Sequence, residues 1–138
     1  MKDMVSEQNL EHDLEKIVAE VIEKLGIPAN VKGYHYCKNG IMMFIKNDME
    51  YLGKVTTKLY PEIAKRYDTT PSRVERGIRT AIASAWKRGK HELIEEFFYK
   101  VDEKPPTNAE FLAMIAEKIK MYLKNNAERE NYDVENSK

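Results

Sequence analysis

The 138-residue chain contains one cysteine, Cys37, and therefore cannot form an internal disulfide. The apolar neighbours of Cys37 favour a small core residue over a nucleophile. No segment approaches the run of about 18 apolar residues that a membrane-spanning helix needs, and the N-terminal residues lack the apolar core of a secretory signal. We therefore expect a cytoplasmic protein without membrane contact. Its length suffices for one domain with a hydrophobic core.

Residues with catalytic or metal-binding chemistry are also scarce. The three histidines, His12, His35 and His91, lie far apart on different predicted elements, so no pair has the spacing of a metal site. The glycines are isolated and do not form a phosphate-binding loop. Glu95 and Glu96 are adjacent on a predicted helix and face different ways, which makes them a poor acid and base pair. We predict that the protein is not an enzyme and that it has no cofactor or metal site.

Acidic and basic residues are equal in number, at 23 each, but they are unevenly distributed. The net charge is −4 over residues 1–25, +2 over 26–64, +6 over 65–90 and −4 over 91–138. Phosphate binding depends on the local density of positive charge. Segment 65–90 is therefore the candidate nucleic-acid surface, and the alternative is an ordinary solvated helix face.

Apolar residues recur at helical spacing along most of the chain. The pattern predicts a first helix from about Glu7 that stops at Gly26, and a short helix over 91–99. A last helix begins at a capping box, Thr107 to Glu110, and ends near residue 123.

These limits divide the chain into three parts. We expect a flexible N-terminus over residues 1–6, a helical DNA-binding domain over 7–123 and a disordered charged tail over 124–138.

The stretch 31–46 fits two structures equally well. Alternation over 31–37 and the turn residues Asn39 and Gly40 are typical of a β-hairpin. A helical stripe is also present, formed by Tyr34, Cys37, Ile41, Phe44 and Ile45.

The residues that follow leave a second alternative open. Asn47 and Asp48 either end this element or cap a further helix. Such a helix would have Met49, Leu52 and Val55 on its inner face.

The stretch from Leu59 to Trp86 has the organisation of a helix-turn-helix at about 59–88. Pro61 suits the first turn of a helix, and residues 68–71 are turn and cap residues. The second helix is capped either by Thr70, with proline at its first position, or by Ser72, with a glutamate three residues later completing a capping box.

The second helix, about 71–88, has two faces of different chemistry. Its inner stripe is Val74, Ile78, Ala81, Ile82 and Ala85. On another face lie Arg73, Arg76 and Thr80, with Arg79 beside them. A basic outer face near the start of the second helix is what base reading in the major groove requires. The alternatives are a helical bundle with a basic face and a protein-interaction surface.

Phosphate contacts are expected from polar and basic side chains around this helix. The candidates are Thr56, Lys65, Thr70, Ser72, Lys87 and Arg88.

Three segments, 25–34, 59–86 and 106–118, resemble the C-terminal DNA-binding domain of the master sporulation response regulator of endospore-forming Firmicutes, stage 0 sporulation protein A. The most specific part begins at Thr69 and reads Thr-Thr-x-Ser-Arg-Val-Glu-Arg-x-Ile-Arg-x-Ala-Ile. The resemblance runs from about Leu10 to Leu123. It implies an all-α domain of six helices that contains a helix-turn-helix, with residues 34–46 helical and not a hairpin.

The resemblance also implies a function. The family reads double-stranded DNA boxes close to TGTCGAA, often as tandem dimers. Carried over by position, the side chains that face the bases are Arg73, Glu75, Arg76 and Arg79, followed by Thr80. Arginine suits guanine and glutamate suits cytosine, whereas Glu75 could instead serve as part of the capping box.

Two protein contacts complete this expectation. Phe111 and Tyr122 on the last helix are candidates for a homodimer surface. The segment 91–104 matches the family poorly, and in the family it lies near the surface that engages the RNA polymerase sigma subunit.

The chain departs from the family at several positions. Thr80 stands where a histidine is usual, and Gly77 replaces alanine at a cost of about 1 kcal/mol in helix propensity. Asn39 and Gly40 are expected to loosen the helix over 34–46. The receiver domain that accepts phosphate in the family is not found in this sequence.

The missing receiver supports an alternative function. In that interpretation the chain is a stand-alone protein-interaction paralogue that pairs with a full-length response regulator and modulates it. Its apolar last helix would supply the contact surface.

Overall fold

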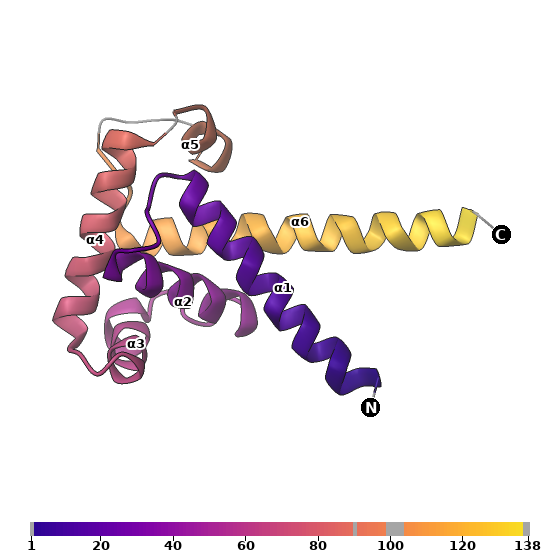
Figure 1. The fold of residues 1–138 in the computed structure, drawn as a ribbon, viewed down its shortest axis with the longest axis horizontal. Coiled ribbons are helices and arrows are strands. Elements are labelled where there is room, and N and C mark those ends of the chain that lie inside the picture. The colour runs from indigo at the N-terminus through magenta and orange to yellow at the C-terminus, as the bar shows by residue number, and fades with distance from the viewer. Residues whose placement is uncertain (1, 90, 99–103, 137–138) are drawn as a thin grey trace.

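The computed structural model describes residues 2–89, 91–98 and 104–136, and every regular element in these ranges is a helix (Figure 1). The elements are α1 Lys2–Lys24, α2 Lys32–Lys46, η1 Val55–Leu59, α3 Tyr60–Arg66, α4 Pro71–Arg88, α5 His91–Phe98 and α6 Asn108–Asn136, where η1 is a short π-helical turn. The prediction of an all-α domain with six helices is confirmed.

Helix α2 lies at the centre of the domain and packs mainly against α1, α4 and α6. Its buried residues lie on more than one side of the helix: Gly33, Tyr34, Tyr36, Cys37, Gly40, Ile41, Met43 and Phe44. A helix enclosed on several sides does not show a single apolar stripe. This explains why residues 31–46 gave a mixed pattern, and the helix implied by the resemblance is the structure observed.

Two glycines of α2 allow neighbouring helices to approach closely. A Cβ atom on Gly33 would lie 2.4 Å from the carbonyl oxygen of Gly77 in α4. A Cβ atom on Gly40 would lie 3.1 Å from Cδ1 of Leu112 in α6. Gly40 was expected to loosen the helix, and instead it lies where α6 packs against α2.

The helix considered for the residues after Asn47 does not form. The Asn47 N–H donates to the Met43 carbonyl and ends α2, and Asp48 and Met49 have φ angles of 49° and 65°. Such angles cannot continue a right-handed helix. Leu52, expected on an inner face, is 55% exposed.

Helical structure extends beyond the expected limits at both ends of the chain. Helix α1 begins at Lys2, within the segment expected to be flexible. Helix α6 continues to Asn136, through most of the segment expected to be a disordered tail, and its yellow end projects away from the other helices (Figure 1). Residues 124–136 contain neither proline nor glycine, so no residue in this stretch breaks the helix.

Candidate nucleic-acid interface

Helices α3 and α4 and the turn between them form the helix-turn-helix. The turn bends at Asp68, which has a φ angle of 50°, and the Thr69 N–H donates to the Ala64 carbonyl at 2.9 Å. Thr70 Oγ1 accepts from the Arg73 N–H at 3.2 Å, with Pro71 following as the first helical residue. The cap is therefore Thr70, which leaves the side chains of Ser72 and Glu75 available for other roles.

The inner stripe of α4 is buried as predicted. Val74, Ile78 and Ala85 have no exposed surface, and Ala81 and Ile82 have almost none. On α3, Ile63 and Ala64 are also buried. This packing fixes the rotation of α4 about its own axis, and so determines which side chains point outward.

The outer face of α4 is cationic. Arg73, Arg76, Arg79 and Thr80 are all exposed, as expected for residues that read DNA bases. Within Pro71–Arg88 the only acidic residue is Glu75. The resulting surface is suited to a polyanion.

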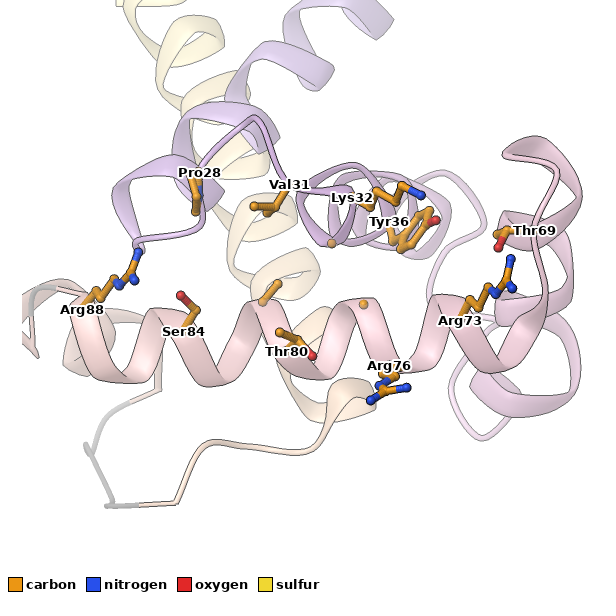
Figure 2. Close-up of a pocket in the computed structure, with 13 residues that line it drawn as sticks. Pro28, Val31, Lys32, Tyr36, Thr69, Arg73, Arg76, Thr80, Ser84 and Arg88 are labelled. Atoms are coloured by element: carbon orange, nitrogen blue, oxygen red, sulfur yellow. The ribbon is translucent and has the colours of Figure 1, made fainter.

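A groove of about 530 Å³ runs along the junction of α4 with the start of α2 and the loop before it (Figure 2). Lys32 and Tyr36 lie on the α2 side, and Thr80 and Ser84 on the α4 side. The charged residues that line the groove are all basic: Lys32, Arg73, Arg76 and Arg88. Lys32 could not be predicted as a groove residue, because nothing local in the sequence shows that the first turn of α2 packs beside α4.

Glu75 and Arg79 lie on the opposite flank of α4, next to α6. Arg79 Nε is 3.3 Å from Glu75 Oε1. Asn108, the first residue of α6, donates to the Glu75 carbonyl oxygen at 3.1 Å and to the Tyr60 hydroxyl at 3.0 Å. Burial raises the pKa of the Tyr60 hydroxyl above its ordinary value. Asn108 thus connects α6, α3 and α4.

A second connection joins α2 to the end of α3. The Asn39 side chain accepts from Arg66 Nη1 at 2.9 Å and donates to the Tyr67 hydroxyl and to the His35 carbonyl oxygen. The Tyr67 ring also contacts the Tyr36 ring edge to face. Asn39 therefore helps to hold the helix-turn-helix against α2.

The six candidates for phosphate contact are all exposed. Thr56 lies on η1, Lys65 on α3, Thr70 and Ser72 at the start of α4, and Lys87 and Arg88 at its end. Of the six, Arg88 lines the groove with Arg73 and Arg76.

The assignment of Phe111 to a dimer surface is wrong. Phe111 has no exposed surface, because its ring stacks on Phe98 of α5 with the ring centres 5.7 Å apart and meets Trp86 of α4 at 6.3 Å. Tyr122, the other candidate, is 57% exposed. Of the two residues proposed for pairing with a second protein, only Tyr122 remains accessible.

Residues 18–119 match the family described as sporulation initiation factor Spo0A C terminal. The chain belongs to this family. The match begins within α1, ends within α6 and includes the whole helix-turn-helix. The family is a DNA-binding domain of sporulation transcription regulators and not an enzyme family.

No described helix is both long and apolar enough to cross a membrane. The described histidine, cysteine, aspartate and glutamate side chains form no group of three or more that could hold a metal ion. Burial raises the pKa of Cys37 to about 12, so its thiol is not a nucleophile near neutral pH.

Proposed function

We propose that this chain is a sequence-specific transcription regulator that places α4 in the major groove of double-stranded DNA. The observation that carries the proposal is the exposed cationic face of α4 within a packed helix-turn-helix. Buried contacts with α2, α3 and α6 hold that face in one orientation. A fixed recognition helix is what selective reading of base edges requires.

The base-reading residues of this proposal are Arg73, Arg76, Arg79 and Thr80. Arginine donates two parallel hydrogen bonds to O6 and N7 of guanine, and threonine pairs with several base edges or contacts the methyl group of thymine. Both strands of a TGTCGAA-like box contain guanine. Gly77 does not face the DNA in this arrangement, because a Cβ atom there would lie 2.9 Å from the Tyr36 ring.

Phosphate contacts come from the residues around α4. They are Thr56, Lys65, Thr70, Ser72, Lys87 and Arg88, to which the groove adds Lys32. Such contacts set the position of the protein on the duplex without reading its sequence.

Fluorescence anisotropy tests the proposal directly. A labelled duplex with a TGTCGAA-like box is titrated with the full chain at two salt concentrations, beside a scrambled duplex of equal length. We expect binding to the box to be tighter by about tenfold or more, and both affinities to fall steeply with salt. A duplex with two tandem boxes also tests pairing of two copies through Tyr122, which would make binding cooperative. Equal affinity for box and scrambled DNA rejects the proposal.

Replacing Lys32 by alanine separates phosphate contact from base reading. The variant should weaken binding to box and scrambled duplex by similar factors and reduce the slope of log affinity against log salt by about 1. Lys16→Ala, which removes an exposed lysine of α1, is the matched control and should leave the slope unchanged. An unchanged slope in Lys32→Ala would show that Lys32 does not contact the DNA backbone.

A further inference from the structure

The first residue of α6 is hydrogen-bonded to the backbone of the recognition helix. Helix α6 begins beside α4 (Figure 1), and Asn108 Nδ2 donates to the Glu75 carbonyl oxygen at 3.1 Å and to the Tyr60 hydroxyl at 3.0 Å. A side-chain amide nitrogen has two N–H donors, so one serves each partner. Tyr60, the first residue of α3, is buried with 6% of its surface exposed. The Asn108 amide is therefore held where three helices meet.

The Glu75 carbonyl lies in the middle of the segment that presents the outer arginines. In an α-helix this oxygen also accepts from the N–H of the residue four positions later, which is Arg79. Asn108 is thus a second donor to an oxygen that already belongs to the ladder of α4. Arg73, Arg76 and Arg79 all lie within about one turn of the point where Asn108 holds the helix.

The other flank of α4 is held by close packing against α2. A Cβ atom on Gly33 would lie 2.4 Å from the Gly77 carbonyl oxygen and 2.8 Å from Ala81 Cβ, so the two helices approach almost to backbone contact. Apolar packing is non-directional and allows small rotations and shifts along the helix axis. A hydrogen bond needs a defined distance and alignment. The bond from Asn108 therefore restrains movements of α4 that packing against α2 leaves free.

We propose that Asn108 is a positioning residue for DNA recognition, which holds α4 in its base-reading orientation through the Glu75 carbonyl and does not contact DNA itself. This inference rests on the proposed function. Base reading requires donors to be held within about 0.5 Å of the productive position. Non-specific binding depends mainly on positive charge and tolerates a larger displacement. Loss of the bond should therefore reduce sequence preference more than overall affinity.

Two substitutions separate the two hydrogen bonds of Asn108. Asn108→Asp keeps the size of the side chain and can still accept from the Tyr60 hydroxyl, but its carboxylate has no N–H to donate to the Glu75 carbonyl. Aspartate is favourable in the first turn of a helix, so α6 should remain folded, which circular dichroism checks. Tyr60→Phe removes the hydroxyl and leaves the bond to Glu75 in place.

Fluorescence anisotropy of the full chain compares a duplex carrying a TGTCGAA-like box with a scrambled duplex. Asn108→Asp should lower the ratio of box to scrambled affinity by about three- to tenfold, and Tyr60→Phe by less than about twofold. The added negative charge of Asn108→Asp weakens both affinities alike, so it cancels in the ratio. Asn108→Ala loses the same bond without a change in charge and should reproduce the loss of preference.

Thr107→Ala is the matched control for a weaker start of α6. Thr107 Oγ1 accepts from the Glu110 N–H at 3.2 Å, so this variant removes a cap from the same helix end and leaves the Asn108 amide unchanged. It should lower the melting temperature and keep the ratio of affinities. An equal loss of preference in Thr107→Ala and Asn108→Asp would mean that general destabilisation causes the effect, and the inference would be wrong.

The remaining outcomes separate failure of the inference from failure of the proposed function. If the natural chain prefers the box and both Asn108 variants keep that preference, the inference is wrong and the proposed function stands. If the natural chain binds box and scrambled DNA equally, the proposed function fails, and the inference that rests on it fails as well.

Discussion

Replacing Arg76 by alanine should remove most of the preference for a TGTCGAA-like box, lowering the ratio of box to scrambled affinity by about tenfold or more. Arg76 lies opposite the buried stripe of α4, since it is about 160° around the helix from both Val74 and Ile78. It is exposed and lines the basic groove. No other side chain of α4 points as directly away from the core.

The comparison with scrambled DNA is essential to this test, because losing any arginine weakens binding to a polyanion. Lys87→Ala is the matched control: it removes an exposed positive charge near the other end of α4 and should reduce both affinities by the same factor. Arg76→Lys keeps the charge but loses the planar fork, so it should retain affinity and lose preference. An unchanged ratio in Arg76→Ala would mean that Arg76 does not read a base.

The recognition helix was predictable because its pattern is local and one-sided. Val74, Ile78 and Ala85 follow helical spacing, and the Thr70 and Pro71 pair marks the start of the helix. The choice between Thr70 and Ser72 as the cap was not predictable, because both have a suitable side chain. Only the hydrogen bond from the Arg73 N–H decides it.

Features that depend on contacts between distant segments were not predictable. Lys32 reaches the interface because Gly33 lets α2 pack closely against α4. Asn108 reaches the recognition helix because α6 begins beside Glu75. The sequence shows each of these residues as an ordinary polar residue at or near the start of a helix. Their roles come from packing that periodicity does not describe.

The burial of Phe111 within the chain was also not predictable from the sequence, although Phe111 is apolar. Spacing placed it on the apolar face of the last helix, but spacing cannot tell whether that face packs within the chain or against a second protein. The answer depends on Trp86 and Phe98, which come from two other helices and enclose the ring.

Phe111→Ala should therefore behave as a core substitution and lower the free energy of unfolding by about 3–5 kcal/mol. The loss combines the burial of a whole aromatic ring with the cavity left between Trp86 and Phe98, and a domain with total stability of about 5–15 kcal/mol would lose a large share of it. Urea denaturation followed by circular dichroism measures the change. Far-UV circular dichroism is preferred over fluorescence because the variant alters the surroundings of the only tryptophan.

Tyr122→Ala is the matched comparison, since it removes an aromatic ring from the same helix at an exposed position. Its free energy of unfolding should change by no more than about 0.5 kcal/mol. If two copies pair through α6, Tyr122→Ala should instead reduce cooperative binding to a duplex with tandem boxes. A stable Phe111→Ala variant that loses cooperativity while Tyr122→Ala keeps it would contradict the buried position of Phe111 and restore it to a dimer surface. If instead Phe111→Ala is destabilised and Tyr122→Ala is the variant that loses cooperativity, the two substitutions distinguish a core residue from an interface residue on one helix. The two substitutions are of similar size.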